Sequence, residues 1–119
     1  MATDLNRVIL IGRLTHDPES KITPRGKSVC NFSLAVNDRN GVNYIRCIAW
    51  EKTAEIVQKY CKKGKQIAVE GRIQMRSWED ANGKKQYMTE IVLETVKLLG
   101  GQQKSEFDHG FEPDDDVVF

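Results

Sequence analysis

The sequence has no long apolar run. Its longest early run, residues 8–11, is closely flanked by Asp4 and Arg7. A secretory h-region needs at least about seven apolar residues and a membrane span roughly 20. We therefore expect a cytoplasmic protein without a membrane partner.

Residues suited to metal, disulfide or catalytic chemistry are also scarce. The cysteines are Cys30, Cys47 and Cys61, and the histidines are His16 and His109. The cysteines are odd in number and lack a C-x-x-C pair, and the histidines are far from a zinc-type spacing. The His16-Asp17 pair is best interpreted as the start of a turn at Pro18. We expect buried apolar cysteines, no metal or cofactor, and no enzymatic activity.

A strong net charge is missing too, because 18 basic residues nearly balance 17 acidic ones and leave +1. The charge is segregated along the chain: residues 1–103 carry +6, and residues 104–119 carry −5. Such segregation is typical of a nucleic-acid-binding body with an acidic interaction tail. The tail also lacks the apolar residues needed to offset ordering entropy, so we expect it to be disordered.

The body is dominated by strand-like runs with one helical interlude. The predicted strands are residues 6–14, 29–38, 42–50, 65–78 and 86–99, and residues 53–63 are predicted to form a helix. Thr53 is the expected N-cap, and Ala54, Val57 and Cys61 repeat at helical spacing. Three strands, a helix and two strands are the order of an OB-fold, so the fold class is all-β with one helix: a five-stranded barrel.

Asn-Gly pairs mark two hairpins. Asn40-Gly41 favours a type I′ turn, which would place Asn37 opposite Tyr44 and Leu34 opposite Cys47. Around Asn82-Gly83 the register stays open. A two-residue loop and a three-residue bulged loop turn different members of the following apolar set inward, namely Met88, Ile91, Val92 and Leu93.

One predicted sheet face alternates aromatic and cationic residues. It consists of Tyr44, Arg46, Ile48 and Trp50 on one strand and Arg72, Gln74, Arg76 and Trp78 on another, and we call it the aromatic face. Stacking platforms and nearby cations are what a single-stranded nucleic acid requires. The alternative is that these aromatic residues pack at an oligomer interface.

The first strand is apolar on both faces. Val8 and Leu10 point to one side, and Ile9 and Ile11 point to the other. A small barrel buries only one face of a strand, so these four residues are the predicted oligomer interface. The alternative is that a neighbouring loop covers the outer side.

Several ordered motifs resemble the bacterial single-stranded DNA-binding protein family, over residues 5–99 and again at the extreme C-terminus. They are NRVILIGRL from Asn6, Asp17-Pro18-Glu19, the helix from Ala54-Glu55 to Lys62-Lys63-Gly64, and EGRIQMRSW from Glu70. The resemblance implies an OB-fold homotetramer that binds and protects single-stranded DNA, independently of sequence, in replication, recombination and repair. It also implies a nucleoid-associated protein.

The resemblance assigns DNA-binding roles to matching positions. It implies stacking by Tyr44, Trp50 and Trp78, and phosphate contacts by Arg46, Lys52, Lys62, Lys63, Arg76 and Lys21. Arg72 is a further predicted phosphate contact, because alternate residues of a strand share a face and Arg72 lies on the same face as Arg76. The alternatives are an RNA-binding OB-fold module and a non-catalytic assembly adaptor.

The family resemblance also divides the chain. Residues 1–99 would form the DNA-binding and oligomerisation domain, 100–113 a short flexible linker, and 114–119 an acidic tip that recruits partner proteins of replication, recombination and repair. The tip is Asp114, Asp115, Asp116, Val117, Val118 and Phe119, where the family has Asp-Asp-Asp-Ile-Pro-Phe. Val117 and Val118 thus depart from the family pattern.

Overall fold

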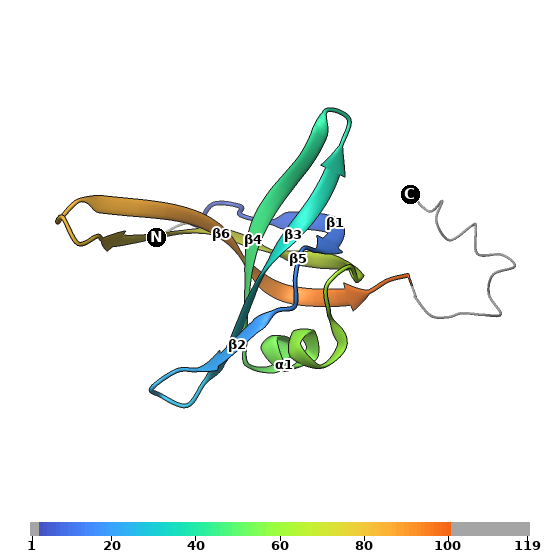
Figure 1. Ribbon diagram of the computed structural model, residues 1–119, viewed down its shortest axis with the longest axis horizontal. Helices are drawn as coiled ribbons and strands as arrows, with labels where there is room; N and C mark the ends of the chain where they lie inside the picture. Colours follow the sequence, from blue (N-terminus) through green and yellow to red (C-terminus); the bar gives the residue numbers. More distant parts are fainter. Residues whose placement is uncertain (1–2, 101–119) are drawn as a thin grey trace, which may run out of the picture.

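A computed structural model describes residues 3–100 of the chain (Figure 1). Its elements are β1 (Val8–Leu14), β2 (Glu19–Ile22), β3 (Ser28–Asp38), β4 (Gly41–Trp50), α1 (Glu51–Tyr60), β5 (Gln66–Glu79) and β6 (Lys85–Leu98). The all-β class with one helix is confirmed. The predicted linker and acidic tip, apart from Gly100, lie outside the described residues.

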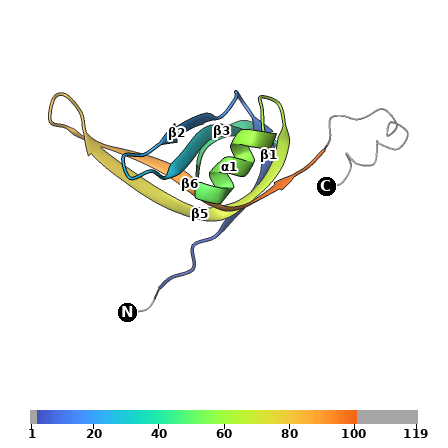
Figure 2. The same cartoon turned by 90° about the horizontal axis from the view of Figure 1, so that it is seen from below.

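Five strands close into a barrel, as predicted. They are hydrogen-bonded in the order β1-β5-β6-β4-β3, and β1 also pairs with β3, which closes the ring. The close approach occurs at Gly12, where an added Cβ would lie 2.5 Å from the carbonyl oxygen of Ala35. Helix α1 packs against β3, β4 and β6 at one end of the barrel (Figure 2).

The short strand β2 was not predicted. It pairs only with β3, at the edge of the sheet, and all four of its residues are exposed. Its sequence, Glu-Ser-Lys-Ile, has little β-propensity and no buried face. The turn that follows holds it against β3: the Lys27 amide donates to the Thr23 hydroxyl, and Gly26 has a φ of 87°.

The predicted register of the first hairpin is wrong by two residues. Tyr44 lies opposite Ala35 rather than Asn37, and Asp38 pairs with Gly41. The Asp38 carboxylate accepts hydrogen bonds from the Asn40 amide and the Asn43 side chain, which centres the turn on residues 39–40. A shift of two preserves side-chain parity, so the predicted faces remain correct.

The helix begins earlier than predicted. It starts at Glu51 directly after Trp50, and no side chain caps it, so the prediction of Thr53 as N-cap is wrong. Glu51 has a φ of 51°, a conformation that turns the chain sharply from strand to helix. The predicted helical repeat is buried as expected: Ala54, Val57 and Cys61 are each at most 1% exposed.

The barrel interior is filled by small and branched apolar side chains. They include Leu14, Cys30, Phe32, Leu34, Cys47, Ala49, Ala54, Val57, Cys61, Ile67, Val69, Ile91 and Leu93. The three cysteines are buried free thiols. Burial raises the pKa of Cys47 to about 12, which leaves that thiol protonated at neutral pH.

The β5–β6 hairpin extends beyond the barrel (Figure 2). Val69 is buried, whereas Met75 on the same face is 63% exposed. The pairing of β5 with β6 shifts between Glu70 and Gly71. An added Cβ at Gly71 would lie 2.0 Å from the carbonyl oxygen of Val92, so the crossing of the two strands requires glycine there.

The loop of this hairpin is the three-residue alternative. The Asp80 amide donates to the carbonyl oxygen of Lys84, and residues 81–83 form the loop. Gly83 has the left-handed φ of 78° that a bulged three-residue loop needs. With this register, β6 is buried on both faces over residues 90–93.

No helix within residues 3–100 is long and apolar enough to cross a membrane.

Candidate nucleic-acid interface

The aromatic face lies on the outside of the sheet, with β6 between β4 and β5. Tyr44 is 68% exposed, Trp50 39% and Trp78 42%. On β3, the residues paired with Tyr44, Arg46 and Ile48 are Ala35, Ser33 and Asn31. These neighbours are small or carry a short amide, so they leave the rings accessible to flat groups.

Trp50 lines an open pocket of about 570 Å³. Arg72, Gln74 and Val92 line it from the sheet, and Thr23, Pro24, Arg25 and Lys27 line it from the β2–β3 loop. An ion pair of 3.7 Å joins Lys27 in that loop to Glu51 at the start of α1. The pocket therefore combines one indole ring with several cations, two of which are loop residues that the sequence did not single out.

Arg46 and Arg76 meet at a buried carboxylate. The Nε atom of each arginine lies 3.4 Å from an oxygen of Glu90, and the Glu90 side chain is only 1% exposed. The two arginine side chains remain 40% and 48% exposed. The structure thus brings these predicted phosphate contacts together across β6.

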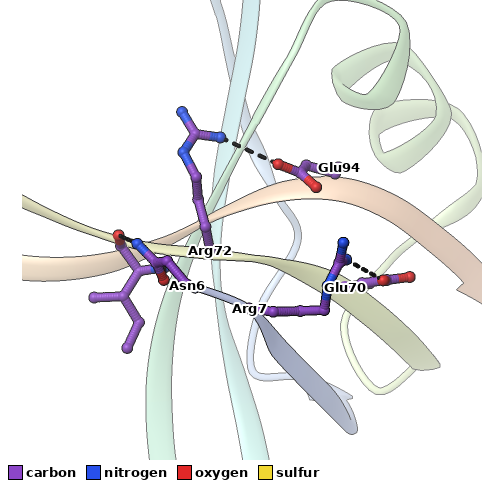
Figure 3. A network of polar contacts seen from close by, with 6 residues as sticks. Asn6, Arg7, Glu70, Arg72 and Glu94 are labelled. Atoms are coloured by element: carbon purple, nitrogen blue, oxygen red, sulfur yellow. Dashed lines mark hydrogen bonds and ion pairs between the residues drawn. The ribbon is translucent and has the colours of Figure 1, made fainter. Parts of the chain in front are cut away.

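Arg72 has a separate acidic partner. Its guanidinium lies 3.4 Å from Glu94 of β6, and both side chains are nearly half exposed (Figure 3). The same view shows Arg7 paired with Glu70, next to the start of β1. Asn6 exchanges two 2.9 Å hydrogen bonds with the backbone of Ile73, which attaches the segment before β1 to β5.

Trp78 lies towards the far end of the β5–β6 hairpin, opposite Gln86. The Arg76 guanidinium carbon is 5.9 Å from the centroid of the Trp78 ring, within range of a cation–π contact. An exposed ring next to a cation can stack a base and attract its phosphate. Trp78 and Trp50 therefore present exposed rings on different parts of the sheet.

The predicted lysines do not all lie at the aromatic face. Lys62 and Lys63 line a different pocket of about 370 Å³, together with Tyr60, Gly64 and Lys65. Lys52 is exposed on α1 and Lys21 is exposed on β2, and neither lines the two pockets described above. These lysines extend the basic surface around the barrel rather than forming part of one compact site.

The four β1 residues predicted to form an oligomer interface lie on two different faces of the strand. Val8 and Leu10 pack against the core, whereas Ile9 is 68% exposed and Ile11 is 41% exposed. Among residues 3–100, no loop buries the Ile9 side chain, and Ile11 is partly covered.

Sequence reasoning missed Glu90, Glu94 and the β2–β3 loop as parts of this site. The two glutamates lie in the strand whose register the sequence left open, so their side-chain direction was not predictable. The loop was predicted only as a turn, because its position beside Trp50 depends on the pairing of β2 with β3. Residues 3–100 contain no group of three or more histidine, cysteine or acidic residues placed to hold a metal ion.

Comparison with known proteins connects this geometry to a family. The family model described as "Single-strand binding protein family" matches residues 5–99. "Single-stranded DNA-binding protein 3" of Listeria innocua is 46% identical over 106 residues, which cover 83% of this chain and 66% of that protein.

Two further relatives agree. "Single-stranded DNA-binding protein" of Bacillus cereus is 44% identical over 115 residues, 87% of this chain and 68% of the relative. "Single-stranded DNA-binding protein 1" of Chlorobaculum tepidum is 45% identical, over 86% of this chain and 69% of the relative. The chain thus spans about two thirds of the length of these relatives. It belongs to the single-strand binding protein family.

Proposed function

We propose that the protein binds single-stranded DNA, independently of base sequence, through the aromatic face. The observation that carries this proposal is the exposure of Tyr44, Trp50 and Trp78 on one side of the sheet that also carries three arginines. The names of the relatives, which are single-stranded DNA-binding proteins, give independent support.

Binding combines stacking with charge. Bases stack on Trp50 in its pocket, on Trp78 of the projecting β5–β6 hairpin and on Tyr44 of β4, because every base has a π-face. Arg46, Arg72 and Arg76 contact phosphates beside these rings. Lys21, Lys52, Lys62 and Lys63 extend the cationic path around the barrel. Stacking and phosphate contacts carry no base identity, which accounts for sequence independence.

The test is a titration of intrinsic tryptophan fluorescence with a thymidine homopolymer, since Trp50 and Trp78 are the only tryptophans in the chain. We expect quenching that saturates at a defined ratio of nucleotides to protein. Competition with a matched uridine homopolymer distinguishes DNA from RNA binding, and tighter binding of the RNA would favour an RNA-binding module. Unchanged fluorescence at low salt would contradict the proposal and favour an assembly adaptor.

The protein is further proposed to act as a homotetramer whose contacts include the outer face of β1. Exposed Ile9 and Ile11 support this proposal, because two large apolar side chains side by side favour burial. Val8 and Leu10 contribute indirectly by anchoring the strand to the core. Sedimentation of Ile9→Lys tests this arrangement: a shift to a smaller species is expected, and an unchanged tetramer would exclude Ile9 from the interface.

Residues 114–119 are proposed to recruit replication, recombination and repair proteins. Support comes from the sequence, where three aspartates precede the apolar residues Val117, Val118 and Phe119. Residues 1–99 would then form the DNA-binding and oligomerisation domain, and 100–113 the linker. Deletion of 114–119 should leave DNA binding intact or slightly tighter, because it removes acidic charge that competes for the basic body. Pronounced weakening would contradict this division.

The proposed role is protection of single strands in DNA replication, recombination and repair, without catalysis and without a cofactor. The relatives are named as DNA-binding proteins, which supports a binding role. A protein with this role would be cytoplasmic and associated with the nucleoid.

A further inference from the structure

The aromatic face contains one buried acid at its centre. Glu90 lies on β6, between the two strands that carry the aromatic and cationic residues, and is opposite Gln74 of β5. Its side chain is 1% exposed, so the carboxylate is withdrawn from water in a surface proposed to bind a polyanion. A buried carboxylate is unfavourable unless cations compensate it.

Two arginines from different strands supply that compensation. Arg46 of β4 and Arg76 of β5 each place Nε 3.4 Å from a different oxygen of Glu90. Arg46 Nε and both carboxylate oxygens are buried, and none makes a hydrogen bond within the described residues. The contact is therefore ionic, and it holds the Nε atom of each guanidinium close to the sheet.

We propose that Glu90 is a positioning residue for phosphate binding: it holds Arg46 and Arg76 at a fixed separation across β6, with nearly half of each arginine side chain left exposed. This inference rests on the proposed function of the aromatic face. A fixed pair of guanidinium groups loses less side-chain freedom when a phosphate binds, which strengthens binding. Arg76 is thereby also kept beside the ring of Trp78.

A simple counter-charge and a positioning residue predict opposite changes in DNA affinity when Glu90 is neutralised. Removing an acid from a polyanion-binding face increases its positive potential and should tighten binding. Positioning predicts that the same removal weakens binding, because both arginines lose their common anchor. The direction of the change therefore distinguishes a positioning residue from a simple counter-charge.

The test measures the affinity of the full-length wild-type protein and of its Glu90→Gln and Glu90→Asp variants for a thymidine homopolymer at matched salt. Glu90→Gln removes the charge at constant shape, and Glu90→Asp keeps the charge but shortens its reach. We expect both to weaken binding, Glu90→Gln by about tenfold, the scale expected when two side chains must be ordered on binding. Thermal melting establishes that each variant is folded, and Glu90→Asp carries the test if Glu90→Gln does not fold.

Glu70→Gln is the matched control, because it removes the same charge from an exposed ion pair with Arg7, and neither residue lines the Trp50 pocket. We expect its binding to be unchanged or tighter. In an Arg46→Gln/Arg76→Gln background, adding Glu90→Gln should produce no further weakening, since Glu90 acts through those arginines.

Three results would overturn the inference. They are wild-type or tighter binding by folded Glu90→Gln, wild-type binding by Glu90→Asp, and an undiminished effect of Glu90→Gln in the double-arginine background. Failure of the wild-type protein itself to bind would instead contradict the proposed function, so the two failures are distinguishable.

Discussion

The two halves of β5 share one alternating pattern but have different surroundings. In the first half Ile67 is fully buried, whereas in the second half Ile73, on the same face of the same strand, is 47% exposed. The strand leaves the barrel after Gly71, where it crosses β6 closely. The first half therefore supports the fold, and the second half holds Arg72, Arg76 and Trp78 out in solvent.

The largest expected effect is on the free energy of unfolding, and it distinguishes the buried half of β5 from the exposed half. Ile67→Ala should lower the free energy of unfolding by about 2–5 kcal/mol, because it creates a cavity in the barrel. The matched change Ile73→Ala should lower it by less than about 1 kcal/mol, because the side chain is already half exposed. Chemical denaturation measures both. Equal losses would mean that the projecting hairpin is as important for folding as the barrel.

A smaller effect is expected on the salt dependence of DNA binding. Arg72→Ala should reduce the slope of log K against log salt by about 0.7, the value for one lost phosphate contact with a single strand. Arg7→Ala is the control, because Arg7 also pairs with a glutamate but does not line the Trp50 pocket. Equal slopes for both variants would remove Arg72 from the proposed interface.

The smallest effect concerns the far end of the hairpin. The Asp80 carboxylate accepts hydrogen bonds from the amides of Lys84 and Asn82 and from Gln86 Nε2, each 2.9 Å long. These bonds, the Lys84 amide first, lower the pKa of Asp80. Its stabilising contribution is therefore present above the ordinary aspartate pKa and is lost as the pH falls through the lowered value.

Asp80→Asn tests this contribution through the melting temperature between neutral and acidic pH. The variant should melt slightly below the wild-type protein at pH 7, and the difference should shrink in acid. Glu79→Gln, a neighbouring exposed change, should not show this convergence. A difference between Asp80→Asn and wild type that stays constant with pH would contradict the role assigned to these hydrogen bonds.

Local patterns predicted the barrel and the faces of its strands. Alternation over residues 29–38 placed Phe32 and Leu34 in the core, and helical spacing did the same for Val57. The assignment of side chains to sheet faces remained correct although the turn at Asn40-Gly41 was placed wrongly, because the error was an even number of residues.

Features set by distant pairing were not predictable. Strand β2 forms only because β3 is there to pair with it, and β6 takes its register from a loop closed by Asp80. Glu90 therefore could not be placed beside Arg46 and Arg76. Alternation also could not show where β5 leaves the barrel, since Ile73 and Met75 continue the pattern of Ile67 after burial ends.

The exposed rings on the aromatic face are proposed to bind single-stranded DNA. The most direct measurement is the affinity of Trp50→Ala, Trp78→Ala and the control Tyr60→Ala for a thymidine homopolymer at matched salt. Each tryptophan variant should weaken binding by about 1–3 kcal/mol, the value for a stacked base in this class of protein. Tyr60→Ala, which removes an exposed ring from α1, should have a smaller effect. Unchanged affinity in both tryptophan variants would contradict the account.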